Sequence, residues 1–325
     1  MTSSPTAVAT ATAPVNRSPA LERLVHALEG TVLGQPQVVA DLVTAFLARG
    51  HVLLEGVPGV AKTLTARSMA SALGLAFTRV QFTPDLMPSD ILGTNVFRPQ
   101  DNAFQLVKGP VFTEVLVADE INRTPPKTQA ALLEAMEERQ VTIDGTTHAL
   151  PSHFFVVATQ NPLELEGTYP LPEAQLDRFL MRVRVGYPPP ESELDMVRAF
   201  HQRQGKAAQV ERVLDASALA ELQVQAARVA CDDSILSYVV RLIRETRSNP
   251  RVRLGASPRS SQALLAAAKA RAALNGSDFV TPDDVKSVCP SVLNHRLLLK
   301  AEAEVEGLTA DDVLRQTLER VQVPR

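Results

Sequence analysis

The sequence is poor in aromatic residues, and neither sign of charge dominates it. Aromatic residues make up 4% of the 325 residues and tryptophan is absent, which argues against a surface that stacks nucleic-acid bases. The 33 Lys and Arg residues nearly balance the 36 Asp and Glu residues, so no overall field draws the chain to a polyanion. We therefore expect no nucleic acid among its partners.

Signals for membrane insertion and secretion are also missing. No apolar run reaches the roughly 18 residues that a membrane-spanning helix needs, and residues 1–20 have no basic start followed by an apolar core. The two cysteines, Cys231 and Cys289, have neither the spacing of a metal site nor a disulfide pattern, as expected in a reducing compartment. We expect no membrane span and a cytoplasmic location.

From residue 51 onward, short apolar runs alternate with helical patterns. Strands are predicted at residues 51–54, 77–82, 115–118, 154–158 and 181–185, and helices at residues 62–73 and 126–138. Strands that alternate with helices predict a mostly parallel sheet with helices on both faces. The expected fold class is therefore α/β.

Two segments interrupt this alternation. Residues 92–113 contain Gly93, Pro99, Gly109 and short extended pieces, and residues 140–150 are typical of a hairpin that turns at Asp144 and Gly145. Both segments are predicted to be insertions in the α/β domain.

The composition also indicates where domains begin and end. Residues 1–18, rich in Thr, Ala, Ser and Pro, are predicted to be a disordered tail. Three prolines after Tyr187 stop both helix and sheet pairing. We expect an α/β domain over residues 19–188 and a smaller, all-helical domain over residues 189–325.

A glycine-containing loop lies between a predicted strand and a predicted helix. It has the form of a P-loop, in which backbone N–H groups and the helix dipole hold phosphate groups. The predicted nucleotide-binding residues are Gly56, Val57, Pro58, Gly59, Val60, Ala61, Lys62 and Thr63. Lys62 would neutralise phosphate oxygens, and the Thr63 hydroxyl would bind Mg²⁺. The general pattern has Gly where Ala61 stands, and a methyl group fits there if the backbone is right-handed.

A second motif supports the first. The apolar strand at residues 115–118 ends in Asp119 and Glu120, the arrangement of a Walker B motif. Asp119 would join Thr63 at Mg²⁺, and Glu120 would orient and deprotonate the attacking water. The Asn-Lys-x-Asp motif with which GTPases read guanine is absent. ATP and Mg²⁺ are therefore the expected cofactors.

With these motifs in place, the chain resembles the AAA+ ATPases, and most closely their MoxR family. The resemblance covers roughly residues 20 to 320, and this family also has Ala before the P-loop Lys. The strings that carry it are DEINR at 119–123, ATQNP at 158–162, EGTYPLPEAQLDRF at 166–179 and GASPR at 255–259. The family implies a P-loop α/β domain followed by a helical lid. The two insertions would be its helix-2 insertion and its hairpin before sensor 1.

The resemblance assigns roles to four further polar residues. Asn161 would be sensor 1 and hold the attacking water or a γ-phosphate oxygen, although an Asn before Pro is also an ordinary turn residue. Arg178 resembles an arginine finger that acts on the ATP of the neighbouring subunit. The alternative for Arg178 is a surface arginine paired with Asp177 or another nearby acid. Arg123 is a second candidate for a contact with the neighbour, and Arg259 resembles sensor 2, which would reach the γ-phosphate of its own chain.

The family also implies a biological role. It predicts a homo-oligomeric ring, with a hexamer as the expected number, that hydrolyses ATP to remodel a protein client. Such proteins act as chaperones that mature or activate a complex, for example by metal or cofactor insertion, with a von Willebrand factor A-domain partner. The alternatives are a nucleotide-switched binding scaffold with little turnover and a DNA-acting AAA+ protein.

Overall fold

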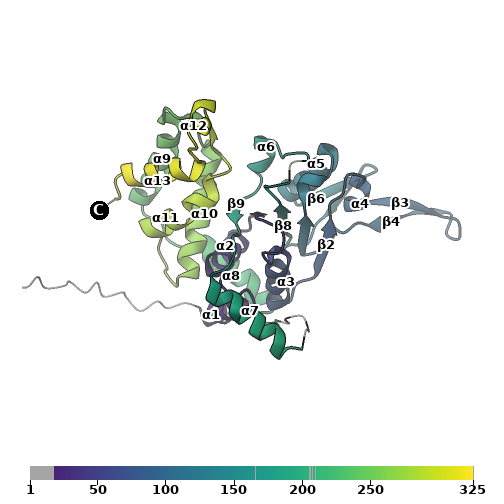
Figure 1. The fold of residues 1–325 in the computed structure, drawn as a ribbon. Helices are drawn as coiled ribbons and strands as arrows, with labels where there is room; N and C mark the ends of the chain where they lie inside the picture. The colour runs from purple at the N-terminus through teal and green to yellow at the C-terminus, as the bar shows by residue number, and fades with distance from the viewer. Residues whose placement is uncertain (1–17, 165, 205, 207, 209, 325) are drawn as a thin grey trace, which may run out of the picture.

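The chain folds into an α/β part and a helical part that lies beside it (Figure 1). The structure, a computed structural model, describes residues 18–164, 166–204, 206, 208 and 210–324. The tail predicted over residues 1–18 therefore lies outside the described residues, except for Ser18.

A parallel sheet forms the centre of the α/β part. Its strands are β1 (Val52–Glu55), β2 (Phe77–Gln81), β5 (Val115–Asp119), β8 (Phe155–Gln160) and β9 (Met181–Arg184). They lie in the order β2-β5-β8-β1-β9, and every neighbouring pair is parallel. The central strands β5 and β8 are buried on both faces, because uninterrupted apolar runs suit a covered sheet.

Helices cover both faces of this sheet. They are α1 (Pro19–Glu29), α2 (Pro36–Leu47), α3 (Lys62–Leu73), α4 (Pro88–Leu92), α5 (Pro126–Glu138), α6 (Glu173–Leu176) and the short 3-10 helix η1 (Ile121–Arg123). Side chains alternate along a strand, so Val52 and Leu54 join the core beneath α1, α2 and α3. Leu53 joins the opposite core with α4 and α5. The α/β prediction is confirmed.

Both predicted insertions contain antiparallel ribbons. The first holds β3 (Gly93–Arg98) and β4 (Ala103–Lys108), and the second holds β6 (Gln140–Ile143) and β7 (Thr146–Ala149). The second ribbon turns at Asp144 and Gly145, both with positive φ, as predicted. Figure 1 shows the β3–β4 ribbon extending away from the sheet on the side opposite to the helical part.

The helical part follows β9. Its helices are α7 (Pro190–Gln202), α8 (Ala216–Arg228), α9 (Asp233–Ser248), α10 (Pro258–Leu274), α11 (Pro282–Leu293), α12 (Ala301–Val305) and α13 (Ala310–Arg320). The prediction that this part is all-helical is wrong in one detail. Strands β10 (Val252–Leu254) and β11 (Leu298–Leu299) form a small antiparallel ladder. Strands this short are too brief for an alternating pattern to reveal.

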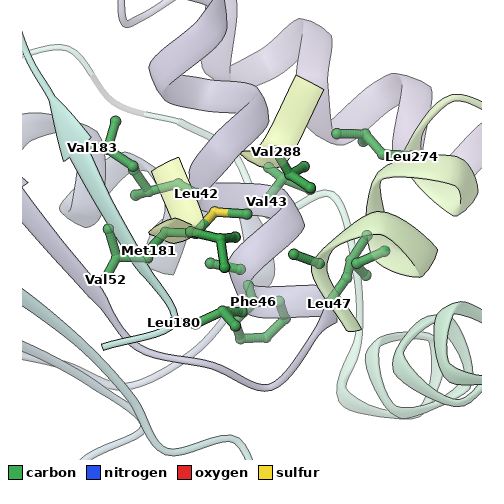
Figure 2. Close-up of a cluster of buried hydrophobic side chains, with 14 of the residues drawn as sticks. Leu42, Val43, Phe46, Leu47, Val52, Leu180, Met181, Val183, Leu274 and Val288 are labelled. Carbon is green, nitrogen blue, oxygen red and sulfur yellow. The ribbon is translucent and has the colours of Figure 1, made fainter. Parts of the chain in front are cut away.

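One continuous core joins the two parts. Figure 2 shows Phe46 of α2 and Met181 of β9 in the same apolar cluster as Val288 of α11 and Leu274 of α10. The helical part is therefore packed onto α2 and the edge strand β9. Within the described residues, no helix combines the length and the apolar character that crossing a membrane requires.

Candidate nucleotide-binding site

The P-loop connects the carboxyl end of β1 to the first turn of α3, as predicted. Gly59 has φ of 87°, a conformation that favours glycine, and Gly56 lies so close to β9 that an added Cβ would be 2.3 Å from a backbone oxygen. Ala61 has φ of 63° and ψ of 20°, which is left-handed. The right-handed backbone that the sequence analysis set as the condition for a methyl group is therefore not the one observed. An alanine in this conformation costs about 1 kcal/mol relative to the right-handed helix, which explains why the general pattern has Gly.

Lys62 begins α3 and turns its ammonium group towards the loop. Nζ donates hydrogen bonds to the backbone oxygen of Gly56 and, at 3.4 Å, to that of Gln160 at the end of β8. Burial lowers the pKa of Lys62, while the carboxylates of Asp119 and Glu120 oppose that change. A partly buried ammonium group at the N-terminus of a helix is suited to neutralising phosphate oxygens.

Asp119 lies at the carboxyl end of β5, beside the start of α3. Its side chain is 11% exposed, and Oδ2 is 3.4 Å from the Thr63 hydroxyl. Oδ1 accepts a hydrogen bond of 2.5 Å from Thr159 on β8. A carboxylate beside a hydroxyl is the oxygen donor set that Mg²⁺ prefers, so Thr63 and Asp119 fit the predicted metal.

Glu120 follows Asp119 in a left-handed conformation, with φ of 57°. Non-glycine residues in this region are strained, and such strain concentrates at functional sites. The backbone N–H of Glu120 donates to the Thr159 hydroxyl at 2.9 Å, which fixes the turn after β5. Its carboxylate accepts a hydrogen bond of 2.6 Å from Gln81 and lies 3.1 Å from the Arg123 guanidinium.

Asn161 immediately follows β8, the strand next to β5. Its side chain is nearly buried, and Oδ1 accepts a hydrogen bond of 3.2 Å from the backbone N–H of Leu163. Nδ2 donates to Glu164 at 3.4 Å. The turn bond that sequence reasoning offered as the alternative is therefore formed, at a position close to Glu120 and the P-loop.

Arg123 belongs to the same cluster. It pairs with Glu120 at 3.1 Å and with Glu164, both in its own chain. These bonds raise the pKa of Arg123, chiefly through Glu164. The structure thus connects Arg123 to the acid of its own site, which does not favour the predicted contact with a neighbouring chain.

Arg178 and Arg259 lie together, far from these residues. Both bind Glu137 at the end of α5, at 2.8 Å from Arg178 and 2.9 Å from Arg259. Hydrogen bonds from Arg259 and then Arg178 lower the pKa of Glu137. Pairing of Arg178 with an acid was an alternative from the sequence, but the sequence did not single out Glu137 as that acid.

This arginine pair lies at the amino edge of the sheet. Leu180, two residues beyond Arg178, donates its N–H to the oxygen of His51, which precedes β1. The P-loop begins after the other end of β1, and four strand residues span about 13 Å. The predicted reach of Arg259 to the phosphates of its own chain is therefore corrected, because the depth of the sheet separates the two.

Sequence reasoning also missed a hollow and two polar residues. The hollow, of about 440 Å³, is lined on one side by the P-loop and on the other by residues outside any motif, among them Val32, Gln35, Tyr187 and Met196. Its partly apolar wall fits a nucleotide base next to the phosphate loop. The polar residues, Arg79 and Gln81 on β2, contact Asp119 and Glu120. The only sequence signal for these two site residues was an Arg and a Gln two residues apart on a predicted strand.

Comparison with known proteins adds the family. The "ATPase family associated with various cellular activities (AAA)" matches residues 51–181, and the AAA lid domain matches residues 244–317. A crystal structure from Cytophaga hutchinsonii superposes with a TM-score of 0.87 at 39% identity, and the match covers 94% of this chain and 95% of that one.

Three bacterial relatives match along nearly the whole chain. YeaC of Bacillus subtilis is 46% identical over 94% of this chain and 95% of its own. Chaperone MoxR1 of Mycobacterium tuberculosis is 44% identical over 94% of this chain and 82% of its own. Protein MoxR of Methylorubrum extorquens is 33% identical over 94% of this chain and 95% of its own. The chain therefore belongs to the MoxR family of AAA+ ATPases.

Proposed function

We propose that this chain binds ATP with Mg²⁺ and hydrolyses it to ADP and phosphate at the carboxyl edge of its sheet. The observation that carries the proposal is the meeting of three different groups there. The Lys62 ammonium, the Thr63–Asp119 oxygen pair and the Glu120 carboxylate come from the start of α3 and the end of β5. A phosphate, a metal ion and a water each have a matching partner.

Each residue has a distinct task in this proposal. The N–H groups of residues 56–63 and Lys62 bind the phosphates, and Thr63 and Asp119 hold Mg²⁺. When bound, Mg²⁺ neutralises charge on the phosphate oxygens. Glu120 orients the attacking water and takes its proton. Asn161 holds that water or a phosphate oxygen once its amide leaves Glu164.

Two variants test the nucleotide site. Lys62→Ala should lose binding of a fluorescent ATP analogue, whereas Glu120→Gln should bind it and release no phosphate. Lys127→Ala, which removes an exposed lysine at the start of α5, is the matched control and should behave as wild type. Normal phosphate release by Glu120→Gln would remove Glu120 from its role as the base.

We further propose that Arg178 and Arg259 act on the ATP of the next copy in a ring, which we take to be a hexamer. Their position at the amino edge of the sheet supports this, because they cannot reach their own P-loop across the strands. A pair of guanidinium groups suits the charge that spreads over the phosphoryl group during transfer. Hydrolysis would then depend on assembly.

Mixing inactive variants distinguishes action in the same chain from action in the neighbour. Arg178→Ala mixed with Lys62→Ala should regain part of the phosphate release, because some interfaces combine an intact P-loop with an intact Arg178. Arg178→Ala mixed with Arg259→Ala should regain none, because every interface then lacks one of the two arginines. Recovery in the second mixture would show that Arg259 serves its own chain.

The proposed biological role is a chaperone-like remodeller that matures or activates a client complex, by metal or cofactor insertion. The name of the relative MoxR1 supports the chaperone part. The β3–β4 ribbon offers a client-binding surface, since Phe104 is 72% exposed and packs edge-to-face on Phe97 at 5.4 Å. A von Willebrand factor A-domain partner and a cytoplasmic location belong to the same proposal. The domain limits of 19–188 and 189–325 are also part of the proposal.

Client capture tests this role. Glu120→Gln held in ATP should retain a client, and adding Phe104→Ser should release it. Val305→Ser on α12, where the side chain is 89% exposed, is the matched apolar control and should retain it. If the Phe104→Ser and Val305→Ser proteins retained the client equally, the ribbon would not be part of the client-binding surface.

A nucleotide-switched scaffold with little turnover is the second candidate. The metal-binding acid and the base are already paired with arginines, Asp119 with Arg79 and Glu120 with Arg123, which is compatible with a resting state. Phosphate release by the assembled protein decides between the two, because a scaffold would bind ATP without sustained release.

A further inference from the structure

Strand β2 contributes two polar residues to the site that the proposed function leaves without a task. Arg79 and Gln81 are two residues apart and therefore face the same side of the sheet. Gln81 is in register with Asp119 on the adjacent strand β5. Nε and Nη2 of Arg79 both donate to Asp119 Oδ2, at 2.9 and 2.6 Å.

The Arg79 guanidinium binds the one oxygen that also faces the metal-binding hydroxyl. Oδ1 of Asp119 is engaged by Thr159 at 2.5 Å, while Oδ2 is shared between Arg79 and the Thr63 hydroxyl, 3.4 Å away. The Asp119 side chain is 11% exposed, whereas that of Arg79 is 48% exposed. Arg79 thus reaches Asp119 from the solvent side and can leave without disturbing the core.

Gln81 extends this contact to the second acid. A guanidinium has no acceptor, so Nη2 of Arg79 can only donate to Gln81 Oε1, which it does at 2.8 Å. That bond turns the Gln81 Nε2 group towards Glu120, where it donates at 2.6 Å. Arg79 therefore holds Asp119 directly and Glu120 through Gln81.

We propose that Arg79 is a positioning residue that competes with the divalent cation for Asp119 Oδ2. This inference rests on the proposed nucleotide site. A guanidinium and a divalent cation at one carboxylate oxygen repel each other, so the cation must displace Arg79 or lengthen its bonds.

The test measures metal affinity directly. Mn²⁺ binding to the protein–ADP complex is followed by the loss of the free-ion EPR signal, with fluorescent ADP binding measured in parallel. Arg79→Gln should bind Mn²⁺ about threefold to tenfold more tightly than wild type, as for the loss of a partly exposed, charge-assisted pair. Arg98→Gln at the end of β3 removes the same charge from an exposed position and should leave the affinity unchanged.

A charge-preserving variant isolates the cause. Arg79→Lys keeps a cation beside Asp119 and should stay within about twofold of wild type, because the competition is between charges. Mn²⁺ binding by Arg79→Gln that is equal to or weaker than wild type overturns the inference, as does equal tightening in Arg79→Lys or Arg98→Gln. If wild-type protein binds neither ADP nor Mn²⁺, the proposed nucleotide site falls as well, so the two failures are distinguishable.

Discussion

Arg271→Met should destabilise the fold through a buried ion pair that joins the two parts of the molecule. Arg271 of α10 binds Asp41 of α2 at 2.5 Å and the Thr44 hydroxyl at 3.0 Å. The side chains of Arg271 and Asp41 are 7% and 2% exposed. Methionine keeps most of the volume but leaves the Asp41 carboxylate buried without its cation. Breaking one side of such a pair costs about 3–5 kcal/mol.

The pH dependence of this loss has a definite sign. Burial raises the pKa of Asp41 above its ordinary 3.8, and the Arg271 charge opposes that rise. Without Arg271 the folded pKa rises further, so the folded variant holds a proton that the unfolded chain has released. Stability linked to a raised pKa is complete below the unfolded pKa and is lost as pH rises through the folded pKa. The loss of unfolding free energy caused by Arg271→Met should therefore be smaller at pH 5 than at pH 8.

Urea unfolding followed by far-UV circular dichroism measures both effects, since the chain has no tryptophan for fluorescence. Asp41→Leu combined with Arg271→Met is the informative partner, because removing both charges should recover about 2 kcal/mol or more of the loss. A deficit below about 1 kcal/mol for Arg271→Met would refute the assigned burial cost. A deficit that grows at low pH would refute the role given to Asp41.

Three further predictions concern buried groups. Thr159→Val keeps the shape of a fully buried side chain but removes the hydroxyl that binds Asp119, so it should cost about 1–3 kcal/mol in urea unfolding. Burial raises the pKa of Cys289 to about 12, so an alkylating reagent should modify only Cys231 until the protein is denatured, as read by mass spectrometry. Gly56→Ala should weaken binding of a fluorescent ATP analogue, because the new methyl group meets a backbone oxygen. Unchanged stability, early modification of both thiols or wild-type affinity would contradict the respective prediction.

The sequence predicted the fold best where several local signals agree. Helices α3 and α5 begin and end at the predicted residues, since an apolar period coincides with a P-loop start in one and with Pro126 in the other. The predicted strands of the sheet differ from the observed ones by one or two residues at an end. The ladder of β10 and β11 was missed because its stability comes from partners far apart in sequence, Val252 with Leu299.

The residues of the site were also predictable where local signals agree and were missed where the contact depends on the fold. Residues within a contiguous motif, such as Lys62 and Asp119, could be named from the sequence because the motif fixes their spacing. Arg79 was missed because its contact requires β2 to lie next to β5, which only the strand order reveals. Arg259 was expected at its own P-loop because sequence distance does not tell which edge of the sheet a residue reaches. The left-handed backbone of Ala61 was also beyond a pattern that records residue types alone.

The way the helical part is anchored determines where Arg178 and Arg259 are held for a neighbouring copy. Arg296, after α11, binds Asp177 at 2.6 Å, next to Arg178. Arg271 fixes α10, whose first turn carries Arg259. The two arginines are thus held by segments that ion pairs connect to one core, and both bind Glu137. Weakening the anchor at Arg271 should therefore disturb the pair together, so Arg271→Met should lose phosphate release in the assembled protein while retaining ATP binding. Loss of ATP binding in a folded Arg271→Met protein would mean that the anchor supports the P-loop instead.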